Sequence, residues 1–269
     1  MDERVRARHK LEHDMRTGLR DDQFELYYQP QLDLARNEVV AFEALLRWNH
    51  PEHGMIAPSE FVTLAEENGF IVQLGDWALR RACEEAATWP RGIRVAVNFS
   101  VAQFRSGHVR QSVISALAAT ALSPSRLEIE ITESVLMDDV DDVGSVLQKV
   151  QEMGVGVALD DFGTGFSSLS YLTRMRFDKI KIDKHFIHEL QEEPSSALAV
   201  LRSVVALSKS LGIPTLAEGI ETAEQLELVR AEGCTEAQGY YVGRPMPASH
   251  VAVLLGLQGE DRQNASRAN

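Results

Sequence analysis

The stretch VALDDFGTGF, residues 157–166, places two adjacent aspartates at the end of an apolar run and follows them closely with two glycines. A short apolar run bounded by turn residues is typical of a buried β-strand. Neighbouring carboxylates repel each other, and burial of an unpaired charge is costly. The stretch therefore predicts a buried strand whose end holds something that neutralises Asp160 and Asp161.

Strand-like and helix-like patterns alternate on both sides of this stretch. The runs FELYYQP from Phe24 and VVAFEALLRW from Val39 are rich in Val, Phe and Tyr, which predicts two strands close enough to pair as a hairpin. The polar residues before them predict a helix over residues 2–22. The chain thus begins with a lead helix and a hairpin.

Helices and short apolar strands follow the hairpin. One amphipathic pattern predicts a helix over 59–69, with Ser59 as its N-cap and Gly69 as its end, and a second predicts a helix over 76–89. Further strands are expected in IRVAVNFS, LEIEITES, VGVALDDFG, FDKIKIDK, PTLAEGIET and AQGYYVG, and helices are expected to begin near Val109, Val140, Ser168, Ser196, Ala223 and Ser249.

About eight short strands that alternate with helices in one chain predict parallel βα units closed into an α/β (β/α)8 TIM-type barrel. An open doubly wound sheet is the alternative. No linker interrupts the array. We therefore expect a polar lead over 1–22, one barrel domain over 23–257 and a flexible tail over 258–269.

The composition excludes several classes of protein. Hydrophobic residues make up 44% of the chain, which argues against disorder, and no apolar run is long enough to span a bilayer. A net charge of −13 repels nucleic acid, so no duplex partner is expected. Cys83 and Cys234 are too few for a disulfide framework, and the charged start lacks a secretory signal. These features predict a cytoplasmic domain, which a longer protein could still tether to a membrane.

Polar residues fall at or near the C-terminal ends of different predicted strands, where barrels build their active sites. They are Glu43, Asn98, Glu130, Asp160, Lys181, Glu218 and Gln238. Each alone fits a strand-end charge or a helix cap. Seven at equivalent ends favour one shared site at the barrel mouth.

The chemistry of this set indicates a metal site. Carboxylate and amide oxygens without His or Cys suit Mg²⁺ or Mn²⁺ rather than zinc. Asp160 could bridge two cations and Asp161 could complete the second, so that the repelling charges become ligands. Two such metals favour phosphoryl chemistry, for which Lys181 and Arg47 would donate to phosphate oxygens and Glu218 would act as a base toward water.

The residues resemble those of a known family. EALLRW, YQP, NFS, EITES, DDFGTG, KIDK, AEGIET and QGYY occur in this order between about Phe24 and Leu255. This series is similar to the EAL-domain family of cyclic di-GMP phosphodiesterases. The resemblance implies a (β/α)8 barrel with an antiparallel first strand, in agreement with the predicted hairpin.

The resemblance also implies a ligand set. Glu43, Asn98, Glu130 and Asp160 would hold one Mg²⁺ or Mn²⁺, and Asp160 and Asp161 would hold a second. Calcium could occupy the site unproductively, because it accepts looser oxygen geometry than Mg²⁺.

Other roles follow from the same resemblance. Glu218 matches the proposed general base, although a hydroxide that bridges the metals would leave it only to orient water, and Lys181 matches a catalytic lysine. The residues that match substrate-binding positions are Gln29, Arg47, Asp183 and Gln238, and those that match loop-anchoring positions are Glu133 for DDFGTG and Glu221 near Glu218.

The reaction implied is hydrolysis of one phosphodiester bond of cyclic di-GMP to linear pGpG, in bacterial second-messenger signal transduction. A non-catalytic receptor for the dinucleotide and an interaction domain with a vestigial pocket are the alternatives. No metal or base position of the family is lost in this sequence. The departures from the family pattern are peripheral and are Phe166 for tyrosine, Arg176 for proline, and the GRPMP loop around Arg244.

Two further expectations concern partners. The family dimerises and relays signals through the loop and helix near Ser168, so a homodimer is expected. The lead over 1–22 resembles the connector that follows a sensory or GGDEF domain in composite members, or else it is a solvated helix that caps the barrel floor.

Overall fold

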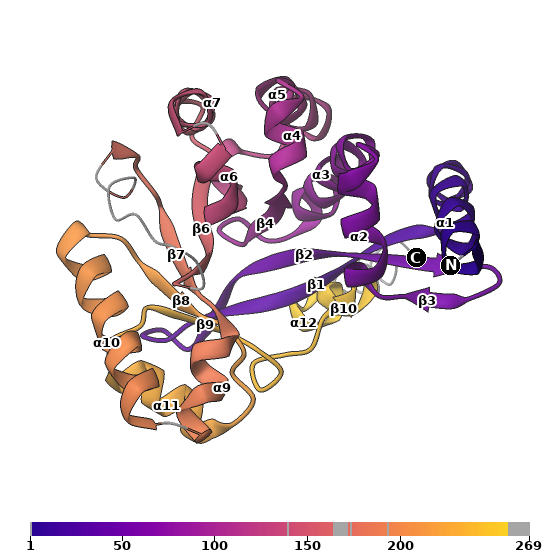
Figure 1. Ribbon diagram of the computed structural model, residues 1–269. Coiled ribbons are helices and arrows are strands. Elements are labelled where there is room, and N and C mark those ends of the chain that lie inside the picture. The colour runs from indigo at the N-terminus through magenta and orange to yellow at the C-terminus, as the bar shows by residue number, and fades with distance from the viewer. Residues whose placement is uncertain (1, 139, 164–171, 173, 193, 258–269) are drawn as a thin grey trace, which may run out of the picture.

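The computed structural model describes residues 2–138, 140–163, 172, 174–192 and 194–257. Its centre is a closed barrel surrounded by helices (Figure 1). The barrel strands are β1 (Phe24–Asp33), β2 (Glu38–His50), β4 (Arg94–Phe99), β5 (Leu127–Thr132), β6 (Gly156–Phe162), β7 (Lys179–Ile182), β8 (Thr215–Ala217) and β9 (Glu236–Gln238).

The strand order confirms the predicted barrel. Neighbours follow as β1-β9-β8-β7-β6-β5-β4-β2, and pairing of β1 with β2 closes the circle. β1 is antiparallel to both β2 and β9. All the other neighbouring strands of the barrel, from β2 through β4 to β9, are parallel to each other. The expected antiparallel first strand is therefore present, and the open doubly wound sheet is excluded.

The helices that follow the hairpin are α2 (Pro58–Glu67), α3 (Ile71–Thr88), α4 (Val101–Arg105), α5 (Val109–Thr120), α6 (Glu133–Asp138), α7 (Val140–Glu152), α9 (Lys184–Glu192), α10 (Pro194–Leu211), α11 (Ala223–Ala231) and α12 (Ala248–Leu254). The predicted starts at Val109, Val140 and Ala223 are confirmed, and α10 and α12 begin within two residues of their predicted starts. The helix expected near Ser168 and the tail over 258–269 lie outside the described residues. No described helix combines the length and the apolar composition that crossing a bilayer requires.

Some predicted boundaries are wrong. Ser59 is not the N-cap of α2, because the helix begins one residue earlier at Pro58, whose fixed φ is already helical, and Ala57 precedes it. Gly69 does follow the end of α2, with a φ of +74°. α3 starts at Ile71 rather than at Asp76, because its first turn buries apolar side chains against the hairpin.

The β1–β2 hairpin extends beyond the barrel. β2 pairs with β4 only from Ala41 to Ala44, so its later residues continue past the C-terminal ends of the parallel strands. The short strand β3 (Gly54–Ile56) pairs with this extension. The lead helix α1 (Asp2–Arg20) packs here as well, at the far end of the hairpin in Figure 1. The lead helix therefore does not cap the barrel floor.

A separate apolar cluster anchors α1 on the extension. Met15 of α1 is fully buried with Trp48 of β2 and Phe61 of α2. His50, also buried, lies with Nε2 at 3.4 Å from Asp14 Oδ2 of α1. The lead helix thus contacts the strand that carries Glu43.

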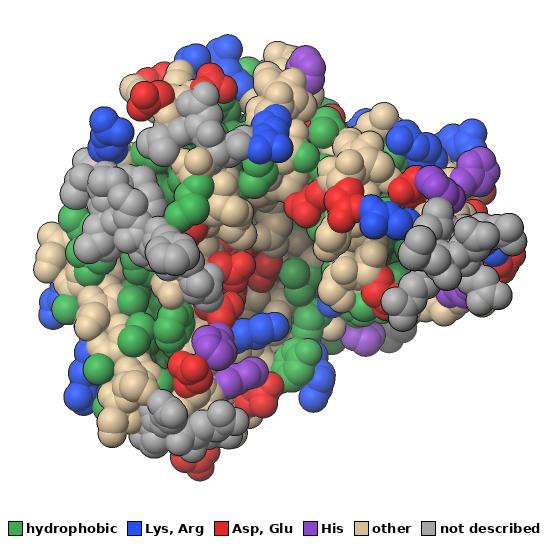
Figure 2. Space-filling view, in the orientation of Figure 1, with side chains coloured by type: hydrophobic (Ala, Val, Ile, Leu, Met, Phe, Trp, Pro, Cys, Tyr) green, Lys and Arg blue, Asp and Glu red, His purple; other side chains and the backbone are tan. Residues whose placement is uncertain are grey.

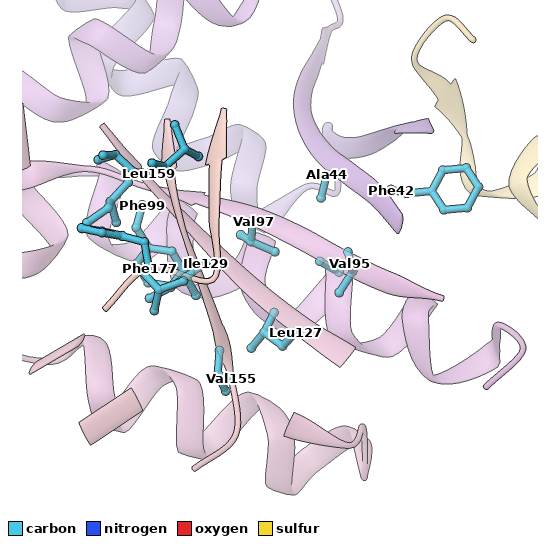
Figure 3. Packing of buried hydrophobic residues seen from close by; sticks show 14 of the residues in the cluster. Phe42, Ala44, Val95, Val97, Phe99, Leu127, Ile129, Val155, Leu159 and Phe177 are labelled. Atoms are coloured by element: carbon cyan, nitrogen blue, oxygen red, sulfur yellow. The ribbon is translucent and has the colours of Figure 1, made fainter. Parts of the chain in front are cut away.

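Strand alternation separates an apolar layer from a polar interior. Val95 and Val97 of β4 pair with Leu127 and Ile129 of β5, and all four are buried in the main core (Figure 3). Glu128 and Glu130 alternate with Leu127 and Ile129 along β5. Their carboxylates contact Lys179 and Lys181 of β7 inside the barrel. The strands therefore carry their charged residues inward.

Candidate active site

The structure brings the seven predicted strand-end residues to one end of the barrel. Glu43 lies on β2, Asn98 on β4, Glu130 on β5, Asp160 on β6, Lys181 on β7, Glu218 directly after β8, and Gln238 at the end of β9. All are buried or partly buried except Asn98, which is exposed at the rim. The convergence expected from the strand pattern is confirmed.

Lys181 lies at the centre of the set, with 1% of its side chain exposed. Its Nζ contacts Glu130 Oε2 at 2.8 Å, Glu218 Oε1 at 2.8 Å, Asp160 Oδ2 at 3.0 Å and Glu43 Oε2 at 3.7 Å. These carboxylates come from four different strands or strand ends. A single ammonium group therefore holds them within a few ångströms of one another.

Side-chain amides fix the orientation of Glu43. Asn98 Nδ2 donates to Glu43 Oε1 at 2.7 Å, and Gln238 Nε2 donates to Glu43 Oε2 at 2.6 Å. Gln238 Nε2 also donates to Gln29 Oε1 at 3.1 Å, and Gln29 Nε2 donates to the carbonyl of Gly243. Gln29, one of the predicted substrate-binding residues, is thus joined to the carboxylate cluster.

The pKa values of the cluster follow from burial and mutual charge. Burial raises the pKa of Glu130 well above its ordinary value and that of Glu218 to about 8, although Lys181 acts against both shifts. Burial also disfavours the charged form of Lys181, but Asp160 and the other carboxylates outweigh it and raise its pKa. Burial therefore opposes full ionisation of the cluster, and the Lys181 ammonium group offsets part of its negative charge.

Glu43 differs from its neighbours. Burial alone would raise its pKa, but the charge of Lys181 and the amides of Gln238 and Asn98 hold the pKa below its ordinary value. The Glu43 carboxyl is therefore ionised at neutral pH, which a cation ligand requires.

Asp161 adopts a left-handed backbone conformation, with φ at +54°, which is uncommon outside glycine. Its N–H donates to Asp160 Oδ1 at 2.9 Å. Burial raises its pKa to about 6, and the charge of Asp160 and a contact with Asp183 add to this shift. The strained turn brings the second aspartate beside the first, where a cation would relieve their repulsion.

Oxygen atoms suited to a hard cation gather at this point. One carboxylate oxygen each of Asp160, Asp161 and Glu218 lies within 4.8 Å of the other two. Glu130 Oε1 and Gln238 Oε1 are buried and accept no hydrogen bond from the described residues. The donor set therefore fits Mg²⁺ or Mn²⁺. This set includes Glu218, which was predicted from the sequence to act as a base. The Asn98 amide donates to Glu43 through its nitrogen, so it would have to rotate before its oxygen could bind a cation.

A cavity of about 290 Å³ opens beside these carboxylates. Its lining includes Glu43, Asp160 and Glu218 and, from α9, Lys184 and His188. Figure 2 shows acidic side chains in the central hollow of this face, with basic and histidine side chains next to them. The cavity thus offers both signs of charge to a ligand.

Lys184 and His188 were missed by the sequence analysis. They are four residues apart on α9, so they share one helix face. Gly219, with φ at +73°, lets the loop after Glu218 approach α9, because a Cβ there would lie 2.5 Å from Lys184 Cβ. The signal that could have identified them was the helical spacing between the last residue of KIDK, Lys184, and the histidine four residues later.

Of the remaining predicted residues, Glu221 belongs to the lining of the cavity and Glu133, Asp183 and Arg47 do not. Glu133 Oε1 accepts the N–H of Gly163 at 3.0 Å, which ties it to the start of DDFGTG. Glu221 lines the cavity, with Oε1 at 3.8 Å from His188 Nε2. Asp183 accepts the N–H of His185 at 2.8 Å, at the start of α9.

Arg47 lies on the hairpin extension rather than in the wall of the cavity. Its Nη1 donates to the carbonyl of Leu46 at 2.7 Å, and its guanidinium lies 5.2 Å from the ring centre of Tyr27. Of the departures from the family pattern, Phe166 lies outside the described residues. Arg244 lies over the ring of Tyr240, at 4.2 Å from the ring centre, near the mouth.

A second buried ion-pair layer, centred on Lys179, was also missed. Lys179 Nζ contacts Gln31 Oε1 at 2.9 Å, Glu128 Oε1 at 2.8 Å and Glu236 Oε2 at 2.8 Å. Glu128 and Lys179 precede Glu130 and Lys181 by two residues on the same strands, so they face the same interior one layer further from the mouth. The alternating patterns EIE (128–130) and KIK (179–181) could have predicted this second layer.

Comparison with known proteins identifies related sequences. The family model of the EAL domain matches residues 12–245. The bifunctional diguanylate cyclase/cyclic di-GMP phosphodiesterase MucR of Pseudomonas aeruginosa is 43% identical over 246 residues, which are 90% of this chain and 36% of that protein. The cyclic di-GMP phosphodiesterase NbdA of the same organism is 41% identical over 257 residues, 93% of this chain and 33% of that protein.

A solved structure has the same architecture. The PaMucR phosphodiesterase in complex with c-di-GMP superposes with a TM-score of 0.87 at 42% sequence identity, covering 90% of this chain and 99% of that one. The chain spans about a third of the length of the curated relatives that it matches.

Proposed function

The chain belongs to the EAL domain family, and from this membership we propose that it is a metal-dependent phosphodiesterase that hydrolyses cyclic di-GMP to linear pGpG in bacterial signal transduction. The observation that carries the proposal is the complete cluster of carboxylates held around Lys181 at the barrel mouth. MucR and NbdA, which are named as cyclic di-GMP phosphodiesterases, support the choice of substrate.

The cofactor of this reaction would be two Mg²⁺ or Mn²⁺ ions. Glu43, Asn98, Glu130 and Asp160 would hold one, and Asp160 and Asp161 the other. The bound ions would supply Lewis acidity and lower the pKa of water. Support comes from the oxygen-only donor set and from the buried Glu130 oxygen, which accepts no hydrogen bond from the described residues. Calcium would bind the same oxygens with looser geometry and without turnover.

Glu218 and Lys181 would act on the attacking water and the developing charge. The oxygen of a water molecule bonds to phosphorus, the bond from phosphorus to O3′ breaks, and O3′ takes up a proton. Glu218 is placed to orient the water and accept its proton, because its partly exposed carboxyl lies beside Asp160 and Asp161. Lys181 keeps the surrounding carboxylates together and stabilises negative charge on the phosphoryl oxygens.

Substrate contacts would come from several sides of the cavity. We assign Gln29, Gln238, Arg47 and Asp183 to the bases and phosphates of the dinucleotide, with Glu133 and Glu221 as loop anchors. Lys184 adds positive charge to the same cavity and the His188 ring adds hydrogen-bonding nitrogens, where the second phosphate of a cyclic dinucleotide needs a partner. The cavity therefore suits a ligand that carries two phosphates.

A test separates the enzyme from a receptor that binds without cutting. Purified protein is incubated with cyclic di-GMP in Mg²⁺, Mn²⁺, Ca²⁺ or a chelator, and products are separated by chromatography while binding is measured by calorimetry. The proposal predicts pGpG with Mg²⁺ or Mn²⁺ only. Saturable binding without product in every metal would identify a receptor instead.

The wider protein is proposed to carry an upstream sensory or GGDEF domain and to work as a homodimer in the cytoplasm. The relatives are about three times longer than this chain, which supports additional domains. Light scattering tests the dimer, and a monomeric mass at high concentration would contradict it.

We also propose that residues 1–22 form the connector of a catalytic domain over 23–257. Deletion of residues 1–22 is a poor test of this proposal. It would remove the fully buried Met15 and expose the apolar side chains that pack against it. Asp14→Asn instead weakens only the contact with His50. A change in turnover or dimer affinity without a change in folding would support the connector, and unchanged values would contradict it.

A further inference from the structure

A larger cavity lies at the opposite end of the barrel from the carboxylate cluster. Its volume is about 1090 Å³, compared with about 290 Å³ at the mouth. Its walls are formed where β4, β5 and β9 begin and where β1 ends, together with the C-terminal ends of α3 and α5. This is the barrel floor, the face that usually serves stability rather than function.

Arginines dominate the lining of this floor cavity. They are Arg36, Arg91, Arg94 and Arg126, and the facing carboxylates are Asp33 and Glu236. Both carboxylate oxygens of Glu236 have a cationic partner: Oε1 accepts a hydrogen bond from Arg94 Nη2 at 2.8 Å, and Oε2 lies 2.8 Å from Lys179 Nζ. Asp33 Oδ2 lies 4.0 Å from Arg36 Nε.

The remaining two arginines have no carboxylate partner within the described part of the chain. Arg91 is exposed in the turn after α3. Arg126 donates only to backbone carbonyls, from Nε to Ile93 at 2.9 Å and from Nη2 to Ala86 at 2.6 Å. The floor cavity is therefore positive in a chain whose net charge is −13, and composition alone does not account for it.

Hydrogen-bond donors in the cavity are positioned but only partly used. Arg94 Nε is buried and has no acceptor among the described residues. The hydroxyls of Ser123 and Ser125 lie 3.0 Å apart on the same wall. The two carbonyl contacts hold the Arg126 guanidinium in place, so a ligand would not have to order it. Donors of this kind around a positive cavity match the oxygens of a phosphate group.

We propose that the floor cavity binds a phosphate-bearing anion, at a site separate from the barrel mouth. The guanidinium groups of Arg91, Arg94 and Arg126 pair with phosphate oxygens, and the serine hydroxyls donate to the remaining ones. The volume is sufficient for a ligand of nucleotide size. This inference does not depend on the proposed phosphodiesterase activity.

Calorimetric titration of the full chain with pyrophosphate, in metal-free and phosphate-free buffer, tests the site. Without metal the carboxylates at the mouth disfavour the probe, and the variants below distinguish binding at the floor from binding beside Lys184. Arg91→Gln removes an exposed cation without breaking a contact of the fold, and about tenfold weaker binding is expected, the effect of one charge-assisted hydrogen bond. Arg110→Gln, on the exposed face of α5 and outside the cavity lining, is the matched control and should bind as the wild type does.

Three outcomes would overturn the proposal. The first is the absence of saturable pyrophosphate binding by the wild type. The second is an equal loss of binding in Arg91→Gln and Arg110→Gln, which would reflect general charge. The third is weakened binding in Lys184→Gln with unchanged binding in Arg91→Gln, which would locate the anion at the mouth. Thermal unfolding of each variant confirms that the fold is retained.

Discussion

Lys181 and Glu130 form a buried ion pair inside the barrel, with Nζ 2.8 Å from Oε2 and at most 1% of either side chain exposed. Burial disfavours the charged form of both groups, and the pKa of Glu130 rises accordingly. Lys181 keeps its charge because Asp160, Glu130 and other carboxylates surround it. The Lys181 ammonium group therefore stabilises the carboxylates that would also bind a metal ion.

Lys181→Met is expected to destabilise the metal-free protein. It leaves several carboxylates without their common partner, and breaking a buried pair in this way costs about 3 kcal/mol. Denaturant unfolding in chelator measures this loss, and added Mg²⁺ should restore part of it, because the ion replaces the missing positive charge. Lys184→Met, an exposed lysine nearby, is the control. An unfolding free energy equal to that of the control would contradict the role given to Lys181.

Gly219→Ala is expected to cost more stability than Gly54→Ala. Both glycines have similar positive φ values, +73° and +71°, so the backbone penalty is shared. A Cβ at Gly219 would meet Lys184 Cβ at 2.5 Å, whereas a Cβ at Gly54 would meet no atom within 4 Å. Unfolding free energies should differ by about 1 kcal/mol or more. Equal values would show that α9 does not depend on close approach to this loop.

Lys184→Gln and His188→Gln are expected to raise KM for cyclic di-GMP with little change in kcat. Both side chains line the cavity but neither contacts the carboxylate cluster, so they would bind phosphate without taking part in bond cleavage. Loss of one charged contact predicts about a tenfold increase in KM for Lys184→Gln. His185→Gln, which removes an exposed neighbour paired with Glu189, is the control. A fall in kcat at unchanged KM would exclude a binding role.

Lys179 predicts a dependence of stability on alkaline pH. Burial would lower its pKa, but Glu128 and Glu236 outweigh burial and raise it above the ordinary value of 10.5. The folded state binds this proton more tightly than the unfolded state, so the contribution is complete below pH 10.5 and is lost as the pH rises through the folded-state pKa. The unfolding free energy of the wild type should fall more steeply above pH 10.5 than that of Lys179→Met. Parallel curves would contradict this.

The sequence predicted the barrel and the convergence at its mouth because both depend on local patterns. Apolar strands such as IRVAV and LEIEI end in polar residues, and parallel strands bring such ends together. The antiparallel first strand followed from two strand patterns separated by a short turn.

Other features depend on contacts between distant segments and were not predicted. The last barrel strand, β9, ends at Gln238, before the predicted YYV run, because Gly239 packs directly on the backbone of Ile220. The start of α9 was included in the preceding strand pattern, although Asp183 accepts the N–H of His185 there. The floor cavity joins loops separated by up to two hundred residues, and no local pattern identifies it.

The rate of cyclic di-GMP hydrolysis by Glu43→Gln, compared with that of the wild type, shows whether the carboxylate cluster carries a metal-dependent reaction. Glu38→Gln, an exposed carboxylate on the same strand, is the control. With Mg²⁺, Glu38→Gln is expected to form pGpG at the wild-type rate, whereas Glu43→Gln is expected to be at least about a hundredfold slower, because an anionic metal ligand is lost. Equal rates for Glu43→Gln and Glu38→Gln would contradict a metal-dependent reaction at the carboxylate cluster.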